Sequence, residues 1–300
     1  MKTSFKKNPF LLAITLLITF AACSDSNNEP ALEAGFEVTI ENIGTEYSLI
    51  KSGSFSVPVG SSAPGPIGPG GAYEFEFTAP IGSKLTFATM FVQSNDWFYA
   101  PDASGIDLYN TDGSKVTGDI TSLINLYDAG TEIDEVPGEG INQAPRQSGV
   151  NTGAFDSDNT VRLVTDSSLP STADVARVTL SSTSSYGFRV RIENVSTNTT
   201  LQTSAGGVAV PLAPGVWAVH SGSETGALFT VGQPDAGLGL EGIAEDGSFG
   251  VLETNLSEVT GITVPFAPGA FAVYSGENPL FISGVTFPDN GIEGVAEDGS

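Results

Sequence analysis

The chain has 300 residues and a formal net charge of −24, from 35 acidic and 11 basic side chains. This acidic excess argues against a nucleic-acid partner, because phosphate binding needs clustered lysine and arginine side chains. It also argues against attraction to an anionic membrane surface. The single cysteine excludes a disulfide bond within the chain.

The first 22 residues are typical of a secretory signal peptide. Lys2, Lys6 and Lys7 precede an apolar run at 10–20 that is too short to span a bilayer as a helix. Two alanines and Cys23 follow, and this ending resembles a bacterial lipobox, in which the cysteine thiol carries lipid. Ordinary secretion with a chance cysteine is the alternative. We therefore expect a signal peptide at 1–22 and a lipidated, polar tether at 23–33.

The residue after the expected lipid anchor bears on the destination of the chain. The residue directly after Cys23 is Ser24, not an aspartate. By resemblance to bacterial sorting rules, this favours the outer membrane. We expect an outer-membrane lipoprotein, periplasmic or surface-exposed, that contacts the membrane through Cys23.

The remaining sequence predicts β-structure. Apolar and polar residues alternate cleanly at 36–41, 73–77 and 188–193, as in strands with one buried face. The run at 85–92 is apolar on both faces and predicts a core strand. No later stretch keeps a helical apolar spacing for three turns, and 36 glycines and 18 prolines fit a loop-rich β fold. The expected fold class is all-β, an antiparallel β-sandwich.

Three sequence segments occur twice. Residues 36–45 (FEVTIENIGT) resemble 188–197 (FRVRIENVST), and 210–222 (VPLAPGVWAVHSG) resemble 264–276 (VPFAPGAFAVYSG). The copies at 210 and 264 each run on to a matching end, at 241–248 and 293–300. We interpret this as a duplication within β-structure. The Ser-rich stretch 181–187 predicts a boundary between a domain at 34–182 and a second region at 186–300.

Acidic side chains gather after strand-like runs in the first of these regions. Asp96 follows a predicted strand, Asp128 and Glu132 flank a short loop, and Asp134 and Glu135 come next. Carboxylates held close together repel unless a cation lies between them. Oxygen ligands favour Ca²⁺ over Mg²⁺, which needs stricter octahedral geometry, and over zinc, which prefers histidine and cysteine. Solvated loop acids without a metal are the alternative.

Two motifs carry a family resemblance. SNDWF at 94–98 and YDAGTE at 127–132 resemble the paired motifs of the spondin N-terminal domain family, which includes F-spondin and mindin. The resemblance covers about 36–182 and implies a C2-like antiparallel β-sandwich with one Ca²⁺ at its edge, bound by Asp96, Asp128 and Glu132. Animal members carry aspartate at the last position. Residues 186–300 resemble a duplicated, partial spondin-like region without the metal motifs, so we expect no such calcium site there.

The expected function is a cell-surface calcium-binding module for adhesion or ligand binding, with an unknown protein or glycan partner. The matrix attachment of animal spondins implies adhesion through the resemblance alone. A structural envelope lipoprotein with a purely stabilising metal is an alternative, and a carbohydrate-active enzyme is another. The sequence has no GxSxG motif, so we expect no catalytic residues. Trp97 is expected to pack beside the metal loop, and His220 to be structural.

Overall fold

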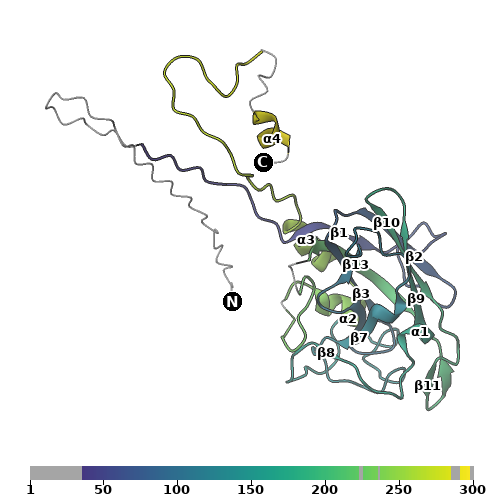
Figure 1. Cartoon of the computed structure of the whole chain (residues 1–300). Coiled ribbons are helices and arrows are strands. Elements are labelled where there is room, and N and C mark those ends of the chain that lie inside the picture. Colours follow the sequence, from purple (N-terminus) through teal and green to yellow (C-terminus); the bar gives the residue numbers. More distant parts are fainter. Residues whose placement is uncertain (1–35, 223–225, 236, 285–290, 298–300) are drawn as a thin grey trace, which may run out of the picture. The chain divides into compact units, whose positions relative to one another are not determined.

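The computed structural model describes residues 36–222, 226–235, 237–284 and 291–297 (Figure 1). The predicted signal peptide, the tether and Cys23 lie outside the described residues. The chain divides into two compact units, one spanning Glu46–Ile262 and the other combining both ends, up to Thr45 and from Thr263.

The unit at Glu46–Ile262 contains every strand that the structure describes. In chain order the strands are β1 Leu49–Phe55, β2 Ala72–Thr78, β3 Ser83–Phe91, β4 Trp97–Pro101, β5 Ile106–Asp107, β6 Gly118–Asp119, β7 Ile124–Asp128, β8 Arg162–Leu163, β9 Ala176–Ser182, β10 Gly187–Asn194, β11 Leu201–Thr203, β12 Gly206–Val208 and β13 Leu212–Ser221. The helices are η1 Thr121–Leu123, α1 Thr172–Val175, α2 Leu240–Asp246 and α3 Gly250–Glu258.

Two antiparallel sheets form a sandwich (Figure 1). The larger sheet has the order β1-β13-β3-β4-β7-β8, with β5 paired to β3, and the smaller sheet has the order β2-β10-β9-β6. A separate hairpin joins β11 to β12. The prediction of an all-β antiparallel sandwich is confirmed.

The smaller sheet follows directly from its alternating sequences. Strands β2 and β10, both predicted, pair with each other, and Phe75 lies opposite Val190. Their apolar residues face the sandwich core. Their charged residues lie on the outer face, where Arg191 forms an ion pair with Glu74 at 2.7 Å. The period of two therefore separates a buried face from a solvated face.

Stacked aromatic rings fill the space between the sheets. Trp217 of β13 lies parallel to Phe75 of β2, with ring centroids 5.5 Å apart and planes inclined by 4°. Phe77 also stacks on Trp217, at 5.4 Å. These contacts join β13 of the larger sheet to the smaller sheet. Offset stacking of this kind contributes about 0.5–1.5 kcal/mol per pair beyond the area it buries.

The outer face of the larger sheet is also buried, because α2 and α3 cover it. Leu240 and Ile243 of α2 and Leu252 of α3 pack against Val216 and Ala218 of β13. This explains why the sequences of β3 and β13 are apolar on both faces. Neither helix was expected, because each is shorter than the three turns over which a helical spacing was sought.

The expected division at 181–187 differs from the structure. Residues 183–186 form the turn between β9 and β10, which pair along their whole length. Strands from both sides of this turn share both sheets: β10 pairs with β2 and β13 pairs with β3. The larger unit of the structure therefore runs from Glu46 to Ile262 across that turn.

The second unit contains one described helix, α4 Ile292–Glu297. Residues 36–41, which were predicted to form a strand, are irregular and exposed here. The segment 264–276 is irregular as well, although its counterpart 210–222 contains β13. Large apolar side chains of this unit face solvent, with Phe266 63% and Phe271 62% exposed.

Candidate metal centre

The β3–β4 connection and the end of β7 with its following loop bring carboxylates together at one end of the larger sheet. Asp96 ends the β3–β4 connection, and Asp128 is the last residue of β7. Strands β4 and β7 pair with Trp97 opposite Asp128, so the register places Asp96 beside Asp128. Asp134 lies six residues further on, in the loop that leaves β7.

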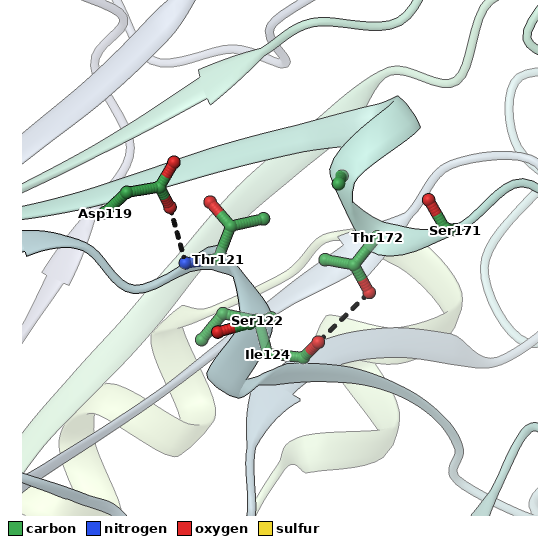
Figure 2. Close-up of a pocket in the computed structure, with 7 residues that line it drawn as sticks. Asp119, Thr121, Ser122, Ile124, Ser171 and Thr172 are labelled. Carbon is green, nitrogen blue, oxygen red and sulfur yellow. Dashed lines mark hydrogen bonds between the residues drawn. The ribbon is translucent and has the colours of Figure 1, made fainter.

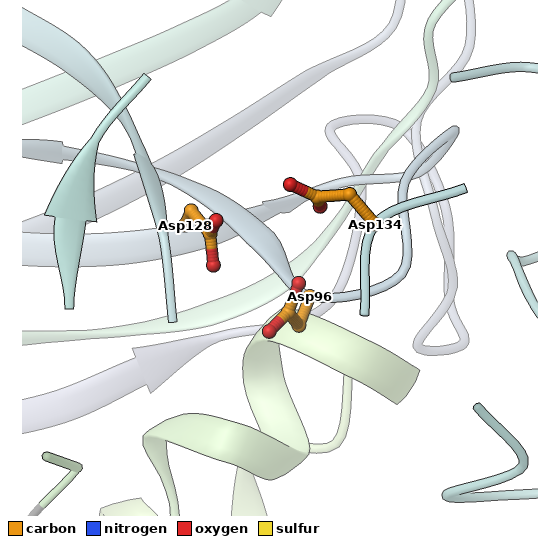
Figure 3. Close-up of side chains that lie close together, drawn as sticks. All are labelled: Asp96, Asp128 and Asp134. Atoms are coloured by element: carbon orange, nitrogen blue, oxygen red, sulfur yellow. The ribbon is translucent and has the colours of Figure 1, made fainter. Parts of the chain in front are cut away.

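The carboxylates of Asp96, Asp128 and Asp134 each offer an oxygen atom, and these three atoms lie within 4.8 Å of one another (Figure 3). Asp96 and Asp128 are buried and Asp134 is exposed. Two oxygen ligands of one Ca²⁺ ion can be up to about 5 Å apart, given metal–oxygen distances of about 2.3–2.6 Å. The spacing therefore allows one metal ion to be held by the three carboxylates.

Asp96 is held rigidly by one oxygen atom. Its Oδ2 accepts hydrogen bonds from the backbone N–H of Thr131 at 2.7 Å and of Glu132 at 2.9 Å. Its Oδ1 is buried and has no hydrogen-bond partner among the described residues. A buried carboxylate oxygen without a partner is unfavourable by several kcal/mol in an apolar environment, so a ligand for Oδ1 is expected.

Asp128 has a cationic neighbour that the sequence analysis did not identify. Its Oδ2 forms an ion pair with Arg162 Nη2 at 2.7 Å, and the same guanidinium nitrogen lies 2.8 Å from Asp156 Oδ2. The backbone N–H of Gly130 donates to Asp128 Oδ1 at 2.6 Å. Arg162 follows Val161 and begins the two-residue strand β8, which gives no alternating pattern, so only the β7–β8 pairing could have revealed it.

Gly130 is needed for the turn of this loop. Its φ of +73° lies in the left-handed region, and a Cβ atom there would overlap the backbone of Thr160. Glycine alone meets both conditions without strain. The turn brings the N–H groups of Thr131 and Glu132 within hydrogen-bond distance of Asp96. The DAGTE sequence therefore also fixes the carboxylate of the β3–β4 loop.

Asp134 is positioned by a buried indole. The Nε1–H group of Trp97 donates to Asp134 Oδ1 at 2.7 Å. The indole ring packs in the sandwich core against Phe91, with centroids 5.9 Å apart. Trp97 therefore packs beside the loops that carry the carboxylates, and it also orients Asp134.

The pKa values of the cluster reflect its crowding. Burial, followed by the negative charges of Asp96 and Asp134, raises the pKa of Asp128 to about 7. Burial, followed by the charge of Asp96, raises the pKa of Asp134 to about 6. Burial also raises the pKa of Asp96, although its hydrogen bonds oppose the shift. Arg162 lowers all three values but does not cancel the shifts.

Glu132, the third ligand expected from the sequence, has other partners in the structure. Its Oε1 accepts from the backbone N–H of Gly153 at 2.7 Å, and its Oε2 accepts from Asn95 Nδ2 at 3.2 Å. The side chain is buried, 3% exposed, and joins two loops. The structure thus brings together Asp96 and Asp128 as expected, with Asp134 as the third member of the carboxylate cluster.

Helix α2 contacts the loops of the carboxylate cluster through Glu245. Glu245 of α2 is buried, and its Oε1 accepts from Thr131 Oγ1 at 2.6 Å. Thr131 Oγ1 also lies 3.1 Å from Asp96 Oδ2. Burial raises the pKa of Glu245 to about 8. This network connects the loops of the carboxylate cluster to helix α2, which covers the sheet.

Away from the carboxylate cluster, a hollow lies between η1 and α1 (Figure 2). Its polar groups are used locally: Asp119 Oδ1 accepts from the N–H of Thr121 at 2.8 Å, and Thr172 Oγ1 donates to the Ile124 carbonyl at 3.0 Å. With one carboxylate and neighbouring hydroxyl groups, it lacks the convergent polar groups of a catalytic or metal site.

No family model, curated protein or solved structure matches the chain. Among the residues that the structure describes, none of the helices combines the length and apolar character needed to cross a bilayer.

Proposed function

We propose that this protein is a surface-displayed, calcium-stabilised binding module of the spondin type, anchored to a membrane through lipid on Cys23. The observation that carries the proposal is the buried Asp96 Oδ1, which has no hydrogen-bond partner in the described chain and belongs to a cluster of three carboxylates. The proposed ligands are Asp96, Asp128 and Asp134.

The charge of the cluster favours a divalent ion. Three ionised carboxylates carry three negative charges, and Arg162 contributes one positive charge that it also shares with Asp156. At least two negative charges therefore remain without a cation. A divalent ion would balance them, and would favour the ionised forms that burial now disfavours.

The chemistry of the ligands favours calcium. The site offers carboxylate oxygens on loops, with one exposed side for water ligands near Asp134. Ca²⁺ accepts six to eight oxygen ligands in variable geometry, whereas Mg²⁺ requires a near-ideal octahedron. Histidine and cysteine are absent from the cluster, which disfavours zinc.

The role of the ion would be to order the loops at one end of the sandwich for contact with a partner. The β3–β4 loop, the loop after β7 and helix α2 all meet at this cluster. A protein or glycan is the partner class that we propose, since loops held on a rigid scaffold are common binding surfaces. For the alternative of a carbohydrate-active enzyme, the carboxylate cluster supplies no argument beyond the presence of paired acids.

Calorimetric titration of the purified protein with Ca²⁺, beside thermal unfolding with and without the ion, tests the metal site. We expect one bound ion and a higher melting temperature in Ca²⁺. The matched variants are Asp96→Asn in the cluster and Asp112→Asn on the surface, where Asp112 caps a turn by accepting from the N–H of Ser114.

Asp96→Asn should abolish both effects and Asp112→Asn should retain them. A melting temperature that millimolar Ca²⁺ leaves unchanged in the unsubstituted protein would refute the calcium site. Screening on glycan and matrix-protein arrays, with Ca²⁺ and with a chelator, then tests the binding role. Calcium binding without any calcium-dependent array signal would favour a purely stabilising metal.

A further inference from the structure

The chain carries two copies of the segments that complete the sandwich. Residues 188–197 contain β10 and residues 210–222 contain β13, and both are internal to the sandwich sheets. β10 lies between β2 and β9, and β13 lies between β1 and β3. Their sequence copies, 36–45 and 264–276, lie in the other unit.

The copy of β13 retains the feature that its position requires most strictly. A Cβ atom at Gly215 would overlap the carbonyl oxygen of Ala88 on β3 and the ring of Phe55 on β1. The corresponding residue is Gly269, where a Cβ atom would meet nothing within 4 Å. The close approach of neighbouring strands therefore requires glycine at position 215, whereas the surroundings of residue 269 do not require it.

The two faces of the copied strand are retained as well. Ala218 of β13 faces the helices and Val219 faces the sandwich core, and the copy has Ala272 and Val273 in their places. Phe271 stands for Trp217, so an aromatic ring is kept in the core position. The pattern of 264–276 is that of a strand buried on both faces.

One hydrogen bond is also duplicated. In the sandwich, Asn194 Nδ2 donates to the carbonyl oxygen of Val210 at 2.8 Å. The corresponding residues are Asn42 and Val264, and Asn42 Nδ2 donates to the carbonyl oxygen of Val264 at 2.9 Å. These two residues are 222 positions apart, so the bond does not follow from proximity in sequence. The two copied segments meet each other as their counterparts do.

The copied pair lacks the sheets that its counterparts complete. Asn194 Nδ2 also donates to the carbonyl oxygen of Ile67. Ile67 belongs to residues 46–182, the part of the sandwich that β10 and β13 complete. Among the described residues of the second unit, no strand is present, and Val273 is 80% exposed. A strand sequence apolar on both faces is unstable in water, and strand addition to another sheet would bury it.

We propose that residues 36–45 and 264–276 are donor strands for the 46–182 core of a second copy of this chain, where they take the positions of β10 and β13. The copy at 264–276 fits that core because it keeps Gly269 and both apolar faces. In such an exchange the resident strands leave and equivalent strands enter, so most contacts are conserved and concentration favours the dimer. Phe271 fills less volume than Trp217, so the resident strand is favoured in dilute solution.

Sedimentation of the full chain over a wide concentration range tests this exchange, in a Cys23→Ser background that prevents lipidation. We expect a dimer whose fraction rises with concentration. Gly269→Val should abolish that dimer while leaving the circular-dichroism spectrum and melting temperature of the monomer unchanged. Gly250→Val, at another exposed glycine with open space around it, is the matched control and should retain the dimer. A chain that stays monomeric throughout, or a Gly269→Val variant that dimerises as strongly as its parent, would overturn the proposal.

A disulfide trap gives a second, independent readout. In the sandwich, Ala218 of β13 lies opposite Thr86 of β3, and Ala272 is the copy of Ala218. Thr86→Cys combined with Ala272→Cys should form a bond between chains under mild oxidation, seen as a dimer in non-reducing electrophoresis and located by peptide mapping. Thiols that stay reduced at dimer-forming concentration, or a bond confined to one chain, would count against the second copy as partner.

Discussion

The carboxylate of Asp128 lies between Arg162 and two other carboxylates, and its ionisation should govern both stability and calcium binding. Its pKa is raised to about 7 in the folded protein, against an ordinary value of 3.8. A carboxyl group with a raised pKa binds its proton more tightly in the folded chain than in the unfolded chain. Its contribution to stability is therefore present at low pH and is lost as the pH rises through about 7.

We accordingly expect the metal-free protein to lose stability between about pH 4 and about pH 7, by at most about 4 kcal/mol from this group. Calcium affinity should rise over the same range, because Ca²⁺ and protons compete for the same oxygens. Urea unfolding and calorimetric titration across this range check both trends. Asp128→Asn should flatten the stability trend, and an affinity independent of pH would contradict the account.

Glu132 and Asp134 can be told apart by matched substitutions. Glu132→Gln keeps the shape of the side chain but turns an amide group toward one of two donors, Asn95 Nδ2 or the N–H of Gly153. We expect a loss of about 1–3 kcal/mol in unfolding free energy and nearly unchanged calcium affinity.

Asp134→Asn should do the reverse, with calcium affinity lowered by at least about tenfold and little change in metal-free stability. Urea unfolding and titration of both variants give the comparison. If Glu132→Gln removed calcium binding while Asp134→Asn spared it, the ligand set expected from the DAGTE motif would replace the one we propose.

The residues differ in how far the sequence could predict them. Asp96 and Asp128 were singled out because both lie at the ends of strand-like runs and belong to the SNDWF and YDAGTE motifs, respectively. Asp134 was missed as a member of the cluster because its position depends on the indole of Trp97. Arg162 was missed because β8 has only two residues and gives no alternating pattern.

At the scale of the element, helix α2 is connected to the loops of the carboxylate cluster through one hydroxyl group. Thr131 Oγ1 donates to Glu245 Oε1 at 2.6 Å, and lies close to Asp96 Oδ2. Thr131→Val removes this hydroxyl at nearly constant volume, and should lower calcium affinity by roughly tenfold, as for other groups that orient metal ligands. Thr131→Ser should restore it. Titration of both variants checks this, and equal losses in the two would exclude the hydroxyl group as the cause.

The strands were easier to predict than the helices for a physical reason. β2 and β10 alternate because each has one solvated face, and β3 is apolar throughout because both its faces are covered. α2 and α3 have seven and nine residues, so neither offers three turns of helical spacing. Their stability comes from packing on the sheet. Residues 36–41 show the opposite case, in which a clear strand pattern forms no strand without a partner.

Packing of α3 on the larger sheet gives a measurable expectation. Leu252 is fully buried against the outer face of the sheet. Leu252→Ala should therefore lower the unfolding free energy by about 2–5 kcal/mol through the cavity it leaves. Val251→Ala, on the exposed side of the same helix, is the matched control and should change it by less than about 1 kcal/mol. Similar losses in both variants would mean that α3 does not cover the sheet as described.

At the scale of the whole molecule, lipidation of Cys23 would decide where the sandwich works. The chain expressed in a bacterial host should partition into the detergent phase and incorporate labelled fatty acid. Cys23→Ser should remove the label and release the protein to the aqueous phase, because acyl chains supply the membrane affinity. Label that persists in Cys23→Ser would exclude the lipobox interpretation.

The position of β13 also bears on the order of events during synthesis. Strand β13 lies between β1 and β3 in the larger sheet. In the sequence, about 120 residues separate the end of β3 at Phe91 from the start of β13 at Leu212. Neither sheet can close until the ribosome has released those residues, because β10 and β13 arrive late. Long-range pairing of this kind slows folding. The chain is therefore expected to keep both sheets incomplete until β13 has been synthesised.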